Sequence, residues 1–323
     1  MEKILVTGAS GQIGTFLVKK LNQNKKKIVG LDIIKPKNNN FPFLKIDLKN
    51  KNELKKSYKE LEDIEILIHL ASTVNSGQDL SSNGIDSVNL NIHGTLNLLE
   101  NLPNLKQISF ASSYMVYGKP KKKIINETHS TDPENIYGAS KLITEKILQV
   151  FSEKKKINLK ILRFMGIYGI VSPYVKQAIP SFIEKMLDKK NPIIFGTGNV
   201  KRNHIYIDDA IDAIIISINN KLNNKLNNKL NNKLNNKLNN KLNNKYNIGG
   251  IDAPSNLELI KIINNEIGTK IEHKFMNSKN KEYSFITDIN NANKKLGFKP
   301  RVGIKEGIQK TVNDYRKLRK NDL

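Results

Sequence analysis

Tyr137 and Lys141 are four residues apart, and their types and spacing could carry out proton transfer. Residues four apart share one face of a helix, so both side chains would point the same way. A phenol with its ordinary pKa of about 10 is a poor base at neutral pH. A neighbouring ammonium stabilises the phenolate and lowers that pKa. We therefore expect Tyr137 to exchange a proton with a hydroxyl group of a substrate.

Ser113 is the third candidate of this group. It ends an apolar stretch, 107–113, that predicts a strand, and its hydroxyl could donate a hydrogen bond to the same substrate oxygen. A Tyr-x-x-x-Lys pair alone is common by chance and is also typical of a surface helix. The segments that precede it in the sequence favour the catalytic interpretation.

A glycine-rich loop, TGASGQIG at 7–14, lies between a short apolar strand and a helical pattern. In such a loop Gly8 makes the tight turn, Gly11 lets the backbone approach a pyrophosphate, and Gly14 lets the helix pack close to the strand. The N–H groups at the amino end of the helix then face the phosphates. The loop predicts a dinucleotide site.

Polar and small residues end the next three predicted strands. Asp32 ends the second strand, where a carboxylate can bind both ribose hydroxyls of adenosine and would repel a 2′-phosphate. This favours NAD over NADP, although Lys35 is near enough in sequence to leave NADP open. Asp47 and Leu48 end the third strand, within reach of adenine. Small residues in 70–72 end the fourth strand and would let the cofactor cross the sheet edge.

The two groups of candidates belong together if the nicotinamide end of the cofactor reaches Tyr137. An oxidised nicotinamide would add its positive charge to that of Lys141 and further stabilise the phenolate. Lys141 could also hold the nicotinamide ribose. Hydride would then move between substrate and nicotinamide while Tyr137 moves the proton.

Alternating strands and helices must position these residues. Apolar runs predict strands at 3–7, 27–32, 43–47, 64–71, 107–113 and 159–164, and helical spacing predicts helices at 13–21, 52–61, 88–102 and 137–153. This alternation is typical of an α/β protein with a parallel, doubly wound (Rossmann) sheet. Ligands of such sheets bind at the carboxyl ends of the strands.

The pattern is looser after Gly169 and predicts a smaller C-terminal substrate-binding lobe. The expected elements are helices at 175–187, 208–218, 256–267, 290–296 and 304–318, and short strands at 193–195, 205–207 and 246–248. We predict an NAD-binding Rossmann domain at 1–170, to which 204–218 and 245–249 return. The lobe then comprises 171–203 and 250–323.

A low-complexity KLNN repeat fills 219–245. With about 3.6 residues per helical turn, its leucines drift around a helix and never form one face. Asn is also a poor helix former. A helical interaction arm is one interpretation of the repeat. We favour an insertion in a surface loop, because long loop insertions cost little stability.

The balance of 54 Lys and Arg against 30 Asp and Glu gives a net charge of +24. Such a balance can indicate an anionic partner, but no aromatic residues are interleaved with the lysines as nucleic-acid stacking requires. The chain has no Cys, and its five His lack metal-ligand spacing. Nothing resembles a signal peptide or a bilayer-spanning run. We therefore expect a cytoplasmic protein with no membrane partner and no metal, and nucleic-acid binding is disfavoured.

Taken together, these motifs resemble those of an extended short-chain dehydrogenase/reductase of the NAD-dependent epimerase/dehydratase family, which acts largely on nucleotide sugars. The glycine loop and Asp32 match, as do NIHGT at 91–95, SYMVYG at 113–118 and YGASK at 137–141. Later segments that fit are GTGNVKRNHIYIDD, YNIGG and LGFKP. By this resemblance, Arg202 matches an arginine that contacts the nucleotide diphosphate.

The motifs and the resemblance together give three sets of candidate site residues. The catalytic set is Ser113, Tyr137 and Lys141. The substrate-binding set is Ser113, Tyr114, Gly166 and Arg202. The cofactor-binding set is Gly8, Ser10, Gly11, Gln12, Ile13, Gly14, Asp32, Asp47, Leu48, Leu70, Ala71, Ser72, Asn91, Tyr137 and Lys141.

The sequence departs from the family pattern at a few positions. Dehydratases carry an Asp-Glu pair directly after the catalytic Ser or Thr, where this chain has Tyr114 and Met115. Neither residue can assist water elimination at neutral pH, so dehydration and the related decarboxylation are disfavoured. Gly166 stands where many members have an Asn beside the substrate phosphates, and Asn203 replaces the usual Asp.

These features favour an NAD-dependent nucleotide-sugar 4-epimerase that acts by reversible hydride transfer. A nucleotide-sugar 4-ketoreductase needs the same three catalytic residues, so the sequence leaves it open. A non-catalytic Rossmann binding protein is the alternative of another class, and its expected sign would be a lost Tyr or Lys. Members of the family commonly dimerise through the helices after the fourth and fifth strands, so the resemblance also implies a homodimer.

Overall fold

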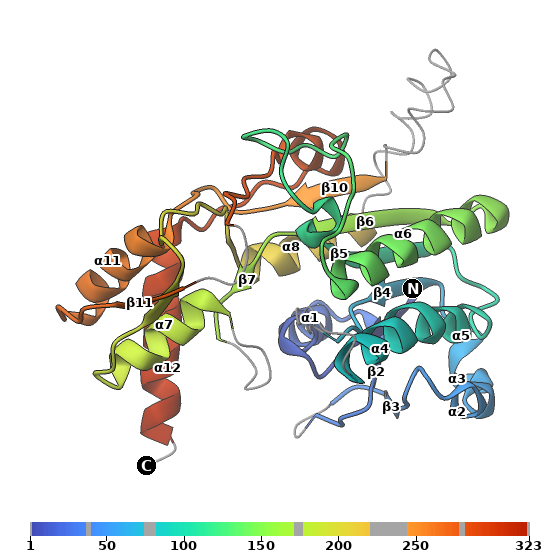
Figure 1. Cartoon of the computed structure of the whole chain (residues 1–323). Helices are drawn as coiled ribbons and strands as arrows, with labels where there is room; N and C mark the ends of the chain where they lie inside the picture. Colours follow the sequence, from blue (N-terminus) through green and yellow to red (C-terminus); the bar gives the residue numbers. More distant parts are fainter. Residues whose placement is uncertain are drawn as a thin grey trace.

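A seven-stranded parallel sheet is the centre of the fold (Figure 1). The computed structural model describes residues 2–36, 40–73, 82–170, 177–219, 244–277 and 282–321, so most of the KLNN repeat lies outside the described residues. Across the sheet the strands are β10 (Lys245–Ile248), β6 (Asn158–Phe164), β5 (Gln107–Ser113), β4 (Ile66–His69), β1 (Lys3–Thr7), β2 (Lys27–Asp32) and β3 (Phe43–Lys45).

The strand order reverses direction at β1. From there the chain runs outward through β2 to β3, and then returns to place β4 on the other side of β1. Thr7 and His69, the last residues of β1 and β4, lie opposite each other in the parallel register. A ligand crevice forms at such a switch point, outside the carboxyl ends of the strands. The predicted doubly wound α/β class is confirmed.

Helices cover both faces of the sheet, because its strands alternate apolar residues between two cores. In β1, Ile4 and Val6 join one buried cluster and Leu5 joins the other. The first face carries α1 (Gln12–Gln23) and α8 (Ile207–Asn219). The second face carries α2 (Lys51–Lys56), α3 (Tyr58–Leu61), α4 (Ser82–Val88), the π-helix η1 (Asn89–Gly94), α5 (Thr95–Leu99) and α6 (Ile136–Lys155).

Most of the C-terminal elements form a group of helices and short strands to one side of the large sheet (Figure 1). The helices α7 (Ala178–Leu187), α11 (Asn256–Ile267) and α12 (Ile304–Asn321) contact one another. Two short parallel pairs join them: β8 (Ile193–Phe195) with β11 (Lys274–Met276), and β7 (Ile167–Tyr168) with β9 (Ile205–Tyr206). Among the described residues, no helix has the length and apolarity to cross a bilayer.

Several predicted elements are shorter or more irregular than expected. The helix predicted at 52–61 breaks at Ser57, whose N–H is shared between two carbonyls of α2, as at a helix end. The third strand stops at Lys45, because its partner β2 ends at Asp32. The helix predicted at 88–102 contains η1, and the one predicted at 290–296 is the π-helix η3 (Ala292–Leu296). Local periodicity cannot distinguish a π turn from an α turn over so few residues.

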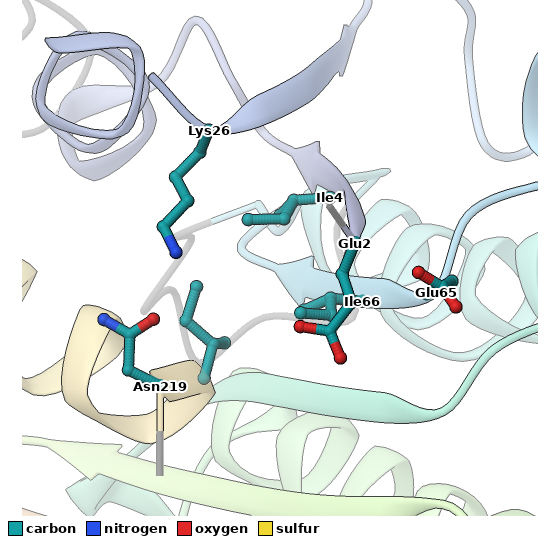
Figure 2. Close-up of a pocket in the computed structure, with 7 residues that line it drawn as sticks. Glu2, Ile4, Lys26, Glu65, Ile66 and Asn219 are labelled. Carbon is teal, nitrogen blue, oxygen red and sulfur yellow. The ribbon is translucent and has the colours of Figure 1, made fainter. Parts of the chain in front are cut away.

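A pocket of about 360 Å³ opens at the amino end of the sheet (Figure 2). It lies beside the first residues of β1 and β4, and the last turn of α8 closes one side. Its lining residues are Glu2, Ile4, Lys26, Glu65, Ile66, Ile218 and Asn219. Ser113 ends β5 at the carboxyl end of the same parallel sheet, so this pocket and the candidate catalytic residues lie at opposite edges.

Candidate active site

The glycine loop turns between β1 and α1 at the switch point. Gly8 has a φ of +68°, and a Cβ there would lie 2.8 Å from the backbone nitrogen of Ala71. A Cβ on Gly14 would overlap the carbonyl oxygen of Gly8. Only glycine therefore allows β1, the end of β4 and the first turn of α1 to approach one another this closely. The amino end of α1, which begins at Gln12, faces the resulting space.

The Asp32 carboxylate at the end of β2 holds this loop. Its Oδ2 accepts a hydrogen bond from the backbone N–H of Ser10 at 3.0 Å, and its Oδ1 accepts one from Ile34 N–H at 3.2 Å. The hydroxyl of Ser10 donates to the Ile34 carbonyl. Each carboxylate oxygen can accept a further hydrogen bond. The geometry therefore fits a carboxylate that both fixes the loop and binds ribose hydroxyls.

Asp47 and Leu48 have different surroundings. The side chain of Leu48 is buried in the core, and its carbonyl accepts from the Asn97 amide at 3.1 Å. Asp47 is half-buried, and its Oδ1 accepts from Lys49 N–H at 2.9 Å in a local turn. Of this predicted adenine pair, Asp47 has the side chain that remains partly accessible.

A buried chain of hydrogen bonds runs through His69 and joins β1 and β4 to η1 and α5. The Thr95 hydroxyl donates to the Asn91 carbonyl at 2.6 Å, so it accepts from Nε2 of His69 at 2.9 Å. The Thr7 hydroxyl then donates to His69 Nδ1 at 2.7 Å and accepts from Ala71 N–H at 3.2 Å. These bonds assign His69 as the neutral Nε2–H tautomer. Burial, assisted by the charge of Lys141, lowers the pKa of His69 to about 3.

Two buried polar atoms test whether the residues fit a dinucleotide. Within the described ranges, Gln12 Nε2 and Asn91 Oδ1 have no hydrogen-bond partner. Gln12 is the first residue of α1, and Asn91 lies in η1 with its Nδ2 donating to Ser140 Oγ at 2.9 Å. A buried donor or acceptor left unpaired costs about 1–3 kcal/mol. A ligand with phosphate oxygens and hydroxyls could pair with both atoms, so these residues fit the predicted cofactor.

The three candidate catalytic residues come together at the carboxyl ends of β5 and β4. The side chains of Ser113 and Ser72 lie near enough to the Tyr137 hydroxyl to lower its pKa. Lys141, one turn further along α6, donates to the Ala111 carbonyl at 2.9 Å, and its Nζ lies 4.8 Å from the centre of the Phe110 ring. Both Tyr137 and Lys141 are buried, with 8% and 2% of their surfaces exposed.

Burial opposes the charged forms of both residues. It raises the pKa of Tyr137 to about 12, although the hydrogen bonds from Ser113 and Ser72 act in the opposite direction. It lowers the pKa of Lys141 to about 7, while the charge of Glu145 raises it. A positive charge beside Tyr137 would favour its phenolate. Burial alone therefore favours the neutral form of each side chain.

Of the candidate substrate-binding residues, Tyr114 directly follows Ser113 and contacts a second segment of the chain. The Tyr114 ring contacts the Phe285 ring edge-on, with centres 4.9 Å apart, and Phe285 forms an isolated parallel bridge with Arg202. These contacts connect the Arg202 segment to the residue next to Ser113. Gly166 lies against His204, whose Nδ1 would be 2.6 Å from a Cβ at Gly166. A larger residue at 166 would have to displace the His204 ring.

Three further residues meet behind Lys141, and no sequence motif indicated them. Glu145 accepts hydrogen bonds from Ser112 Oγ at 2.6 Å and from Arg163 Nε at 2.9 Å. Glu145 and Arg163 are fully buried, which is rare for charged residues. The only sequence signals were a carboxylate four residues after Lys141 and a charged residue inside the apolar run 159–164.

Comparisons with known proteins identify the family of this chain. A model of the NAD dependent epimerase/dehydratase family matches residues 4–232. A putative UDP-glucose 4-epimerase of Methanocaldococcus jannaschii is 33% identical over 321 residues, with 96% of this chain and 97% of that protein covered.

Solved structures show the same similarity. UDP-glucose 4-epimerase from Thermotoga maritima, solved with UDP-glucose, has a TM-score of 0.85 at 26% identity, covering 98% of this chain and 99% of that one. UDP-glucuronic acid 4-epimerase from Bacillus cereus, solved with UDP-glucuronic acid and NAD, has a TM-score of 0.84 at 28% identity and the same coverage. The chain therefore belongs to the NAD dependent epimerase/dehydratase family.

Proposed function

We propose that this chain is an NAD-dependent nucleotide-sugar 4-epimerase. The observation that carries the proposal is that Ser113 ends β5 while the buried Tyr137 and Lys141 lie one turn apart on α6, with Lys141 bonded to the same strand. Two UDP-sugar 4-epimerases are similar to the chain over 98% of its length.

The proposed residues act on one oxygen of the sugar. Ser113 donates a hydrogen bond to the C4 oxygen and orients it toward Tyr137. As the hydride leaves C4, Tyr137 Oη takes the proton of the C4 hydroxyl. When hydride returns to the other face of the keto sugar, the same Oη gives the proton back. Lys141 stabilises the phenolate that exists before the first transfer and again after the second.

NAD, when bound, supplies the hydride acceptor and later the hydride donor. The residues proposed to hold it are the glycine loop with Gln12 at the amino end of α1, Asp32 for the adenosine ribose, and Lys141 for the nicotinamide ribose. Asp32 is already oriented by two backbone N–H groups. A carboxylate at this position favours NAD over NADP, because a 2′-phosphate would face a negative charge.

Arg202 and Tyr114 are proposed to bind the nucleotide part of the substrate. Arg202 is suited to a diphosphate, because its guanidinium can donate two parallel hydrogen bonds. Phe285 links the segments that carry these two residues. We further propose that 171–203 and 250–323 act as the substrate-binding lobe, with 1–170, 204–218 and 245–249 forming the cofactor domain.

Dehydration of the sugar is not supported. It needs an acid or base beside Ser113 other than Tyr137, but the next two residues are Tyr114 and Met115. Tyr114 packs against Phe285, and the Met115 N–H donates to Ser113 Oγ at 3.2 Å. A ketoreductase would use the same three catalytic residues, so cofactor consumption must distinguish it from an epimerase.

The test is turnover of a panel of UDP-, dTDP- and CDP-sugars, followed by NMR of the sugar protons. One set of reactions contains catalytic NAD, and the other contains stoichiometric NADH. Interconversion of 4-epimers without net cofactor consumption supports the proposal. Stoichiometric oxidation of NADH with a keto sugar would identify a ketoreductase instead. Cofactor binding without either reaction would contradict both.

A homodimer through α5 and α6 is part of this proposal. Leu96 on α5 and Ile143 and Val150 on α6 are 42%, 46% and 55% exposed, although they are apolar. A second copy of the chain could cover them. We expect a dimer by light scattering, and a shift toward monomer in Ile143→Lys, because a buried unpaired charge opposes association. A monomeric native chain at micromolar concentration would contradict this part.

A further inference from the structure

We propose that Glu145 is a positioning residue, which together with Arg163 fixes α6 against β5 and keeps Lys141 in its ammonium form. This inference rests on the proposed proton transfer by Tyr137 and Lys141. No motif or comparison assigns a role to Glu145. The proposal stands on its place in the helix, on its hydrogen bonds and on its charge.

Tyr137, Lys141 and Glu145 form one stripe along α6, at spacings of four residues. Their exposed fractions fall along the stripe from 8% through 2% to 0%. Residues at this spacing lie one above the other on the same helix face. Glu145 is therefore directly behind Lys141 as seen from Tyr137, at the most enclosed end of the stripe.

The Glu145 carboxylate connects this helix to two strands. Its Oε1 accepts from Ser112 Oγ on β5 at 2.6 Å and from Arg163 Nε on β6 at 2.9 Å. Its Oε2 accepts from Arg163 Nη2 at 2.6 Å. Ser112 directly precedes Ser113 on β5. One carboxylate thus links the helix that carries Tyr137 and Lys141 to the strand that carries Ser113.

Arg163 is itself held in place, so it can act as a fixed anchor. Its guanidinium stacks over the Tyr117 ring, 4.8 Å from the ring centre, and Tyr117 donates to Asn247 Oδ1 on β10 at 2.6 Å. Replacing a buried ion pair by apolar residues is often neutral or stabilising in proteins. Stability alone therefore does not explain why two charges occupy this position behind Lys141.

The charged and titratable groups around Lys141 give Glu145 its electrostatic role. On α6 these groups are Glu145 and Tyr137, and Tyr137 is neutral near pH 7. On β4 there is His69, which is neutral, and on β6 there is Arg163, bonded to Glu145. The strand below Lys141 contributes the Phe110 ring and the Ala111 carbonyl. Burial lowers the pKa of Lys141 to about 7, and Glu145 is the group whose charge raises it.

The test compares Glu145→Gln with Arg163→Gln in the full-length protein. The native chain should lose kcat above the pKa of Lys141, because the neutral amine no longer stabilises the phenolate. Glu145→Gln keeps the shape but removes the negative charge. We expect the alkaline limb of its kcat profile to move to lower pH by about one unit, which is roughly a tenfold loss at pH 8. The sugar KM should change little.

Arg163→Gln and Glu153→Gln are the controls. Arg163→Gln removes the positive partner and disturbs the same packing, but its alkaline limb should stay or move to higher pH. Glu153 is exposed near the end of α6, and its variant should match the native profile. If the alkaline limb of the kcat–pH profile is unchanged in Glu145→Gln, the proposal is overturned. An equal downward shift in both buried variants would attribute the effect to packing and also overturn it.

A second measurement needs no turnover. In protein labelled with 13C at lysine Cε, the Lys141 signal is identified by its loss in Lys141→Met, and its chemical shift is followed against pH. The Lys141 pKa should be lower in Glu145→Gln than in the native chain. If the native chain has no epimerase activity but this shift appears, the proposed function fails and the positioning role survives. If the pKa is unchanged, the positioning role fails.

Discussion

The two edges of the central sheet both carry ion pairs, but the pairs differ in their exposure to solvent. At the amino edge, Glu65 pairs with Lys106, whose side chain is 66% exposed, beside an open pocket. At the carboxyl edge, the side chains of Arg163 and Glu145 are 1% and 0% exposed. Exposed pairs are screened by water and salt and contribute about 0–1 kcal/mol. Buried ones act strongly on their neighbours.

The pocket at the amino edge shows that a hollow alone does not identify the candidate catalytic group. The pocket in Figure 2 is lined by Glu2, Lys26 and Glu65, yet none of them contacts the candidate catalytic group. At the carboxyl edge, burial shifts the pKa values of His69, Tyr137 and Lys141. Proton transfer needs such groups, held in place and kept out of water.

Replacing Tyr137 should lower kcat far more than any replacement at the amino edge. Tyr137→Phe removes the proton-carrying oxygen and keeps the ring, so kcat should fall by about 10²–10⁴-fold. Glu65→Gln at the amino edge should leave kcat within about twofold, since an exposed pair contributes little. Steady-state assays of both variants with the best sugar of the panel measure this. Equal losses of kcat in Tyr137→Phe and Glu65→Gln would contradict this difference between the two edges.

Gly14→Val should have the next largest effect. The added side chain would meet the Gly8 carbonyl, so α1 must move away from β1. We expect NAD binding to be lost and the free energy of unfolding to fall by about 3 kcal/mol. Calorimetric titration with NAD and denaturant unfolding measure the two effects.

Gly268→Ala is the matched control for this variant. Gly268 ends α11 with a φ of +79°, and nothing lies within 4 Å of the added Cβ. It should lose about 1 kcal/mol from backbone strain alone and bind NAD normally. Normal NAD affinity in Gly14→Val would show that the loop does not approach the cofactor.

His69 should make stability depend on pH at the carboxyl edge. Its pKa is about 3 in the folded chain, below the unfolded value of 6.5. The unfolded chain therefore binds more protons below pH 6.5, and stability present above that pH is lost as pH falls. The free energy of unfolding should drop by about 1.4 kcal/mol per pH unit between pH 6 and 5 from this group.

Denaturant unfolding across that range, in the native chain and in His69→Gln, measures the contribution. The slope should be smaller in His69→Gln by about this amount. His93 is exposed on η1, and His93→Gln should keep the native slope. An identical slope in His69→Gln and the native chain would show that His69 does not titrate between the two states as described.

Shortening the KLNN repeat should have the smallest effect. The repeat begins where α8 ends, at the pocket edge, and every proposed catalytic residue lies at the opposite edge. Deleting 221–240 leaves one KLNN unit, and kcat should stay within about twofold, because loop length has a weak effect on stability. A Gly-Ser segment of the original length is the control. A large loss in a deletion that still folds would contradict the interpretation as an insertion.

The sequence predicted the parts of the site that depend on local spacing. Tyr137 and Lys141 share a helix face whatever the rest of the fold is. The glycine loop can be recognised from the strand before it and the helix after it. Glu145 has the same spacing, but its proposed role depends on Arg163, which bonds to it from β6. The π-helix that contains Asn91 was also unpredicted, because it depends on hydroxyls of Thr95 and Thr144 that bond the Asn91 carbonyl.

Isotope retention at C4 is the sharpest test of reversible hydride transfer at that carbon. The native chain is incubated with catalytic NAD and a UDP-sugar that carries deuterium at C4, in ordinary water. In the proposed reaction the hydrogen on C4 leaves and returns as hydride, while only the oxygen-bound proton passes through Tyr137. NMR should therefore find the 4-epimer with its deuterium fully retained. An epimer that has replaced deuterium by solvent hydrogen would contradict the account.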